Sequence, residues 1–168
     1  MLSADERPSQ RTGGTDLTLL LIRHAEAGDA RDWAGDDVLR PLSPIGRDQA
    51  MRIVALWRDQ PLKRVLSSPF VRCRETVEPL AATLRLEVEE TEALAEGRSL
   101  DALALVHELA GEDVALCTHG DVIPEVLQAL ESEGVHILSE WKWRKASTWV
   151  LHNDDGVLSR ATYVPRPL

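Results

Sequence analysis

The feature that most constrains the fold is a run of four aliphatic residues that ends in a cation and an imidazole. Residues 19–22 follow a polar segment and lead directly into Arg23 and His24. Such a run predicts a strand buried on both faces, as in a parallel sheet, and it is too short to span a membrane. Ligands of open α/β sheets bind at the carboxyl edge of the strands. The run alone fits a ligand site and an ordinary strand end equally well.

The rest of the chain alternates between strand and helix patterns. The predicted strands cover about residues 17–23, 64–67, 86–90, 114–117, 148–151 and 157–164. The predicted helices cover about residues 43–61, 73–84, 99–111 and 120–134, with Ser43 and Ser99 as capping residues. An Asp-Gly pair between the last two strands is a hairpin signal.

Strands that alternate with helices predict βαβ units. The expected fold class is α/β, a three-layer α/β/α architecture whose mostly parallel sheet carries helices on both faces and a C-terminal antiparallel hairpin. A chain of 168 residues has the length of one domain. We expect a flexible N-terminal tail over residues 1–16, which lack an apolar period, and a single domain over residues 17–168.

The net charge and the cysteine content limit the ligands and the cellular compartment that are expected for this protein. The net charge of −9 argues against nucleic-acid binding. Only three of the 19 basic residues are lysines, and arginine suits bidentate recognition of phosphate or carboxylate. Cys73 and Cys117 form no CxxC pair and no signal peptide is visible, so a reducing cytoplasm is expected. Cys117 and His119 lack a second pair of ligands, which argues against a metal site.

Polar residues follow four of the predicted strands, at the edge that parallel strands share. The set consists of two histidines, two arginines and a carboxylate, with one glycine: Arg23, His24, Arg72, Glu96, His119 and Gly120. This chemistry fits phosphoryl transfer. A neutral imidazole can attack phosphorus, guanidinium groups can hold the phosphoryl oxygens, and a carboxylic acid can protonate the leaving oxygen. Gly120, at the start of a helix, would leave backbone N–H groups facing an anion.

The same residues lie in blocks that resemble the histidine phosphatase superfamily, also called phosphoglycerate mutase-like. The blocks are Arg23-His24-Ala25, with alanine in place of the usual glycine; the segment 40–50; Ser67-Ser68-Pro69 followed by Arg72 and Thr76; Leu94-Ala95-Glu96; and Thr118-His119-Gly120. The resemblance covers nearly all of the chain after residue 16, and the chain is most similar to the small phosphohistidine phosphatase-like members. Residues 145–151 also resemble the phosphatase-like half of mycobacterial proteins that carry a Nudix domain, for which these 168 residues leave no room.

The resemblance implies a metal-independent phosphatase with no metal ion or organic cofactor. It implies that His24 is the nucleophile, that His119 also takes part in catalysis, and that Glu96 is the general acid. Four residues would then bind phosphate: Arg23, Arg72, His119 and Gly120. The family's spacing assigns the second arginine to Arg72 rather than to Arg74. Arg40, Lys142 and Lys145 are candidates for the substrate side, although an exposed basic run is more often only a solvated face.

The substrate would be a phosphorylated small molecule or a phosphohistidine protein. No nucleic acid or membrane partner is expected, and the sequence leaves the oligomeric state open. One alternative is a phosphoglycerate mutase-type phosphotransferase, which needs an enclosing lid for which little chain is available. The other is an inactive phosphoprotein-binding module, but such a module would lack a catalytic residue, and every expected position is occupied.

Overall fold

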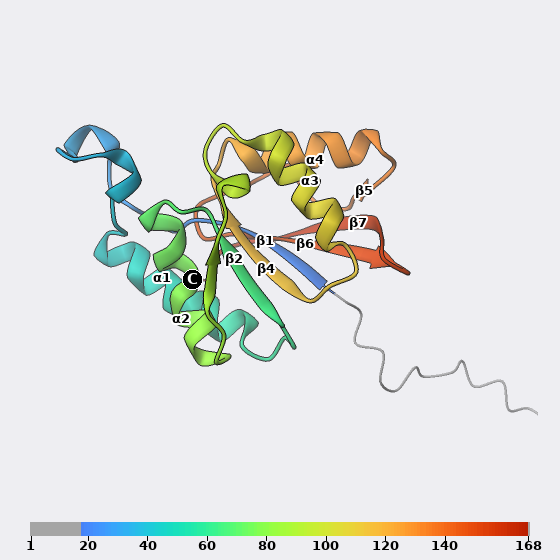
Figure 1. Ribbon diagram of the computed structural model, residues 1–168, viewed down its shortest axis with the longest axis horizontal. Helices are drawn as coiled ribbons and strands as arrows, with labels where there is room; N and C mark the ends of the chain where they lie inside the picture. The colour runs from blue at the N-terminus through green and yellow to red at the C-terminus, as the bar shows by residue number, and fades with distance from the viewer. Residues whose placement is uncertain (1–17, 168) are drawn as a thin grey trace, which may run out of the picture.

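The computed structural model describes residues 18–167. It shows one seven-stranded sheet with α1 and α2 packed on one face and α3 and α4 on the other (Figure 1). The α/β prediction, with helices on both faces and a C-terminal hairpin, is therefore confirmed. The tail predicted over residues 1–16 lies outside the described residues. Among residues 18–167, no helix is both long and apolar enough to cross a membrane.

The strands are β1 (Thr18–Arg23), β2 (Arg64–Ser67), β3 (Val88–Glu90), β4 (Val114–Thr118), β5 (His136–Ile137), β6 (Thr148–Asp154) and β7 (Val157–Val164). The α-helices are α1 (Pro44–Trp57), α2 (Val71–Thr83), α3 (Ser99–Leu109) and α4 (Val122–Ser132). Three short 3-10 helices lie in the connections, η1 (Ala30–Asp32), η2 (Asp37–Leu39) and η3 (Glu92–Leu94). Three details differ from the sequence prediction. Helix α1 ends at Trp57, four residues before the predicted end. The two-residue β5 was not predicted, and the N-cap of α3 is Arg98, because Ser99 is already helical.

The sheet combines a parallel half with an antiparallel half. Its strand order is β3-β2-β4-β1-β6-β7-β5. The first four strands run parallel to one another, whereas β6 is antiparallel to both β1 and β7. The crossover connections between parallel strands place helices on the faces of the sheet. The carboxyl ends of β1, β2 and β4 therefore meet at one edge.

Alternate side chains of β1 enter the two halves of the core. Leu20 and Ile22 pack with the residues of α1 and α2, whereas Leu19 and Leu21 pack with those of α3 and α4. This is the period of two that a strand imposes. Because both faces are covered, the strand has to be apolar at every position, which explains the uninterrupted aliphatic run.

The N-terminus of α1 is fixed against the segment that follows β1. Ser43 caps the helix by accepting a hydrogen bond from the Gly46 N–H at 3.1 Å, and the Ser43 N–H donates to the Glu26 carbonyl at 2.9 Å. A Cβ atom at position 46 would overlap that same carbonyl oxygen. Glycine at position 46 therefore allows α1 to approach the backbone beside His24.

Candidate active site

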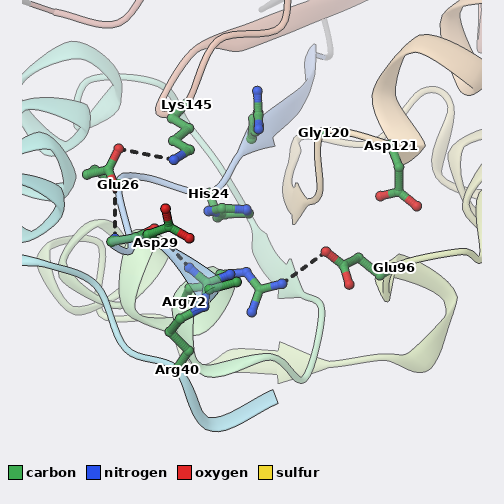
Figure 2. Close-up of a pocket in the computed structure, with 12 residues that line it drawn as sticks. His24, Glu26, Asp29, Arg40, Arg72, Glu96, Gly120, Asp121 and Lys145 are labelled. Atoms are coloured by element: carbon green, nitrogen blue, oxygen red, sulfur yellow. Dashed lines mark hydrogen bonds and ion pairs between the residues drawn. The ribbon is translucent and has the colours of Figure 1, made fainter. Parts of the chain in front are cut away.

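Three neighbouring strands end beside one another, and a functional side chain follows each. β1 leads into His24, β4 into His119, and β2 into the first turn of α2, where Arg72 lies. β4 lies between β1 and β2, so the rings of His24 and His119 come within 5.5 Å of each other between centroids. Figure 2 shows His24 between Lys145 and Arg72, with Glu96 beside Arg72. His24, Arg72, Glu96 and Lys145 line an open pocket of about 600 Å³, and His119 lies buried behind His24.

Hydrogen bonding fixes the tautomer of His24. The Nδ1 atom lies 2.8 Å from the carbonyl oxygen of Ala25, and a carbonyl can only accept, so Nδ1 carries the proton and donates it. Burial lowers the pKa of His24 to about 3, the Ala25 carbonyl opposes this effect, and the charges of Arg72 and Arg23 add to the lowering. At neutral pH the ring is uncharged, and Nε2 holds the lone pair that a nucleophile needs.

The ring of His119 is held against the Ser68 hydroxyl group. The Phe70 N–H donates to the Ser68 hydroxyl oxygen at 3.2 Å, and that oxygen lies 2.8 Å from His119 Nε2. The hydroxyl can donate its own proton to Nε2, and in that tautomer the ring proton is on Nδ1, 3.8 Å from the Glu96 carboxyl group. Burial lowers the pKa of His119 to about 3, and the nearby His24 and Arg72 act in the same direction. With the ring proton on Nδ1, His119 presents a neutral N–H donor on the side of Glu96.

The guanidinium group of Arg23 lies against Gly120. A Cβ atom at position 120 would lie 2.6 Å from Arg23 Cζ, so a larger residue would displace the guanidinium. One nitrogen, Nη1, donates to the Trp143 carbonyl at 2.8 Å. The buried Nε has no hydrogen-bond partner within residues 18–167. Burial lowers the pKa of Arg23 from its usual value, and the charges of Glu26 and Asp121 oppose this lowering.

Arg72 is 1% exposed and is held on both sides by acceptors. Its Nη1 donates to the Asp37 carbonyl at 2.9 Å, and its Nη2 donates to the carboxyl groups of Asp37 at 3.1 Å and Glu96 at 3.0 Å. Its Cζ lies 4.8 Å from the centroid of the Phe70 ring. The Nε of Arg72 is also buried without a partner in the described part of the chain. An oxyanion could satisfy this N–H and the equivalent one of Arg23.

Asp37 connects Arg72 to the loop before α1. Its carboxyl group accepts from Arg72 and, at 3.0 Å, from Arg40 Nε. Partial burial raises the pKa of Asp37, but the hydrogen bonds and charges of these two arginines outweigh it and the pKa is lowered. Arg40 also donates to the carbonyl oxygens of Ala27 and Gly28. Asp37 therefore fixes one cation at the reacting centre and one at its margin.

Lys145 and Glu26 form the opposite wall. Their ion pair measures 3.1 Å, and the second Glu26 oxygen accepts from the Gly28 N–H at 2.8 Å. Burial raises the pKa of Glu26, but the hydrogen bond and charge of Lys145 outweigh it and the pKa is lowered. With Arg23, Arg40, Arg72 and Lys145, the pocket has four cations, and it has as many carboxyl groups in Glu26, Asp29, Glu96 and Asp121. Among residues 18–167, no cluster of His, Cys, Asp and Glu side chains could hold a metal ion.

The structure brings together most of the residues that the sequence singled out, with one exception. Lys142 does not line the pocket and pairs with Glu140 at 2.6 Å. The sequence analysis assigned no role to three residues that position the site: Asp37, Ser68 and Thr76. Thr76 accepts from the Ala25 N–H at 2.9 Å and donates to the Arg72 carbonyl at 2.6 Å, which joins β1 to α2. Ser68 and Thr76 lie within a recognisable block, whereas nothing distinguished Asp37 from the other aspartates of its loop.

The comparisons with known proteins point to one family. A model described as the histidine phosphatase superfamily (branch 1) matches residues 19–99. The 8-oxo-(d)GTP phosphatase of Mycolicibacterium smegmatis is 35% identical over 161 residues, which cover 89% of this chain and 48% of that protein. The phosphohistidine phosphatase SixA of Escherichia coli is 30% identical over 122 residues, which cover 71% of this chain and 62% of that protein. The chain thus spans about half to three-fifths of the length of these relatives.

The fold agrees with a solved structure. The protein histidine phosphatase SixA complexed with tungstate superposes with a TM-score of 0.65, covering 89% of this chain and 96% of that one. The two chains are 24% identical, so this likeness shows the common fold.

Proposed function

Because this chain belongs to the histidine phosphatase superfamily, we propose that it is a metal-independent phosphatase that acts through a covalent phosphohistidine at His24. One observation carries the proposal. The Nδ1–H of His24 is committed to the Ala25 carbonyl, so the unprotonated Nε2 is available to the substrate at neutral pH. A module that only bound phosphate would not need a nucleophile held in this way.

In the first step, Nε2 of His24 attacks phosphorus, a new N–P bond forms, and the bond from phosphorus to the leaving group breaks. The imidazole gains positive charge as the bond forms. The Ala25 carbonyl, which favours the charged ring, stabilises that charge. Arg23, Arg72 and the Nδ1–H of His119 hold the phosphoryl oxygens, on which negative charge concentrates.

Glu96 supplies the proton to the leaving group. Its carboxyl group is 3.0 Å from Arg72 Nη2, and phosphoryl oxygens would compete for that donor. Binding of the substrate therefore releases the Glu96 carboxylate, which takes up a proton from solvent and then lies as a carboxylic acid beside the bond that breaks. After protonating the leaving atom, the Glu96 carboxylate accepts a proton from the water that attacks phosphohistidine. The products are phosphate and neutral His24, and Glu96 regains its proton.

Two substrate classes follow from the relatives, whose names specify phosphohistidine for SixA and 8-oxo-(d)GTP for the mycobacterial protein. We propose that this chain acts on one of the two, a phosphohistidine protein or a small phosphorylated metabolite. The buried free thiols of Cys73 and Cys117 support a reducing cytoplasm as its location.

The experiment is to trap the intermediate. Wild-type protein mixed with phosphoramidate and quenched in alkali should carry acid-labile phosphate, and His24→Ala should carry none and turn over no substrate. His136→Ala, which changes an exposed histidine of β5, is the matched control and should behave like the wild type. Substantial turnover by His24→Ala would overturn the proposal.

A further inference from the structure

A second pocket adjoins the first on the side of the loop between β1 and α1. It measures about 270 Å³ and shares three residues with the catalytic pocket, namely Gly28, Asp29 and Arg40. Its remaining walls come from the loop between β1 and α1 and include Trp33, Pro41 and Leu42. A group attached to a phosphate at His24 can therefore pass Arg40 and enter this second space without leaving the protein surface.

Trp33 gives that space an oriented aromatic wall. Its Nε1 donates to the Asp36 carbonyl at 2.9 Å, and Gly35 lies so close that a Cβ atom there would be 3.2 Å from the same nitrogen. One edge of the indole is thus held within the loop. The side chain is nevertheless 38% exposed, which leaves ring surface available to a ligand. Bases stack on such surfaces whatever their hydrogen-bonding pattern.

The junction of the two pockets carries a cation, Arg40, and the carboxyl group of Asp29. The Arg40 guanidinium is 11% exposed and is oriented by Asp37 and the Ala27 carbonyl. Lys145 lies in the catalytic pocket, where it pairs with Glu26. A ligand that reaches from His24 to Trp33 therefore passes Lys145 and Arg40, with the Asp29 carboxyl group beside them, before it meets the aromatic wall. A nucleoside phosphate has this order of parts, with phosphate, then sugar, then a flat base.

We propose that the pocket lined by Trp33 binds the nucleobase of a nucleoside phosphate whose terminal phosphoryl group reacts at His24. The inference rests on the proposed phosphatase function and names its substrate class. Trp33 binds the part of the substrate that does not react, so it contributes equally to the ground state and the transition state. Its loss should therefore raise KM and leave kcat unchanged.

The test compares guanosine diphosphate with methyl diphosphate, which carries the same terminal phosphoryl group on a diphosphate but has no base. Phosphoramidate serves as the minimal substrate. Stacking of one base corresponds to roughly 5- to 150-fold in binding. Trp33→Ala should raise KM for guanosine diphosphate by that factor and leave KM for methyl diphosphate and phosphoramidate unchanged. Trp33→Phe loses the same hydrogen bond to Asp36 but keeps an aromatic face, so it should recover most of the affinity. Trp141→Ala removes an indole that is 42% exposed and lines neither pocket, and it should have no effect.

Binding can be measured without turnover in the His24→Ala background. There, Trp33→Ala should weaken the affinity for guanosine diphosphate by the same factor in calorimetry. Equal effects of Trp33→Ala on all three substrates, or equal effects of the Ala and Phe variants, would refute the base site and assign Trp33 to loop structure. Turnover of phosphoramidate or of a phosphohistidine peptide without turnover of guanosine diphosphate would refute the nucleoside phosphate as the substrate. The proposed phosphatase function would still stand. Failure of the wild type on every substrate would refute the proposed function itself.

Discussion

Replacing Arg72 by alanine should abolish most of the catalytic advantage of the site while leaving the fold in place. Arg72 is 1% exposed, and its nitrogens point at Asp37, Glu96 and the pocket. The two carboxyl groups that it would leave behind are each nearly half exposed, so water can solvate them. The main loss therefore concerns the phosphoryl group in the transition state.

The magnitude follows from the donors that Arg72 can offer. Its Nε is buried without a partner in the described residues, and its Nη2 is shared with Glu96, which a phosphoryl oxygen could displace. Two charge-assisted hydrogen bonds of about 1.5–3 kcal/mol each correspond to about 3–6 kcal/mol. At ~1.4 kcal/mol per factor of ten, kcat/KM should fall roughly 10²- to 10⁴-fold.

Arg74→Ala provides the matched control. Arg74 lies two residues further along α2, is 41% exposed, and pairs with Glu78 and Glu90 outside the pocket. Exposed pairs of this kind contribute about 0–1 kcal/mol to stability, so its kcat/KM should stay within about twofold of the wild type. Arg72→Lys should recover only part of the loss, because an ammonium group cannot offer the two parallel donors of a guanidinium.

The assay is steady-state hydrolysis of phosphoramidate, with thermal unfolding of each variant measured in parallel. Loss of activity in a variant that unfolds at the wild-type temperature is the expected result for Arg72→Ala. If Arg74→Ala lost as much activity as Arg72→Ala, or more, the assignment of the phosphate-binding arginine would be wrong. Wild-type activity in Arg72→Ala would remove this arginine from the mechanism.

Glu96→Gln should slow hydrolysis of an alkyl phosphate ~10²- to 10⁴-fold more than that of nitrophenyl phosphate, whose leaving group needs no proton; equal slowing of both would exclude a proton-donor role. The pKa of His119 is lowered from 6.5 to about 3 in the folded state, so the stability that this residue contributes is complete above pH 6.5 and is lost as pH falls toward 3. In the His119→Asn variant, the melting temperature should therefore fall less steeply than in the wild type as the pH is lowered from 6.5 to 4. The control variant His136→Asn, at an exposed histidine, should show the wild-type dependence of melting temperature on pH. The wild-type dependence in His119→Asn would contradict the lowered pKa. Gly46→Ala should lower both the melting temperature and the activity, because the new methyl group overlaps the Glu26 carbonyl oxygen. The control variant Ile45→Ala changes a side chain that is 65% exposed and should change neither quantity. A Gly46→Ala variant as stable as the wild type would disprove the close contact.

The sequence by itself determined which chain segments form the candidate site. A continuous aliphatic run means a strand buried on both faces, and strands that alternate with amphipathic helices mean parallel neighbours. Parallel neighbours bring their carboxyl ends to one edge, so the residues after them had to meet. The choice between Arg72 and Arg74 agrees with helical geometry, because residues two apart on a helix face nearly opposite directions.

Only the tertiary structure decided which contacts hold those residues and which of the residues lie outside the pocket. Asp37 meets Arg72 across 35 residues, and Ser68 meets His119 across 51. No local periodicity specifies such pairs, because they depend on the path of loops and on distances of tenths of an ångström. Lys142, near Lys145 in the sequence, pairs with Glu140 instead of lining the pocket, because loop conformation and not residue type determines where a flexible cation lies.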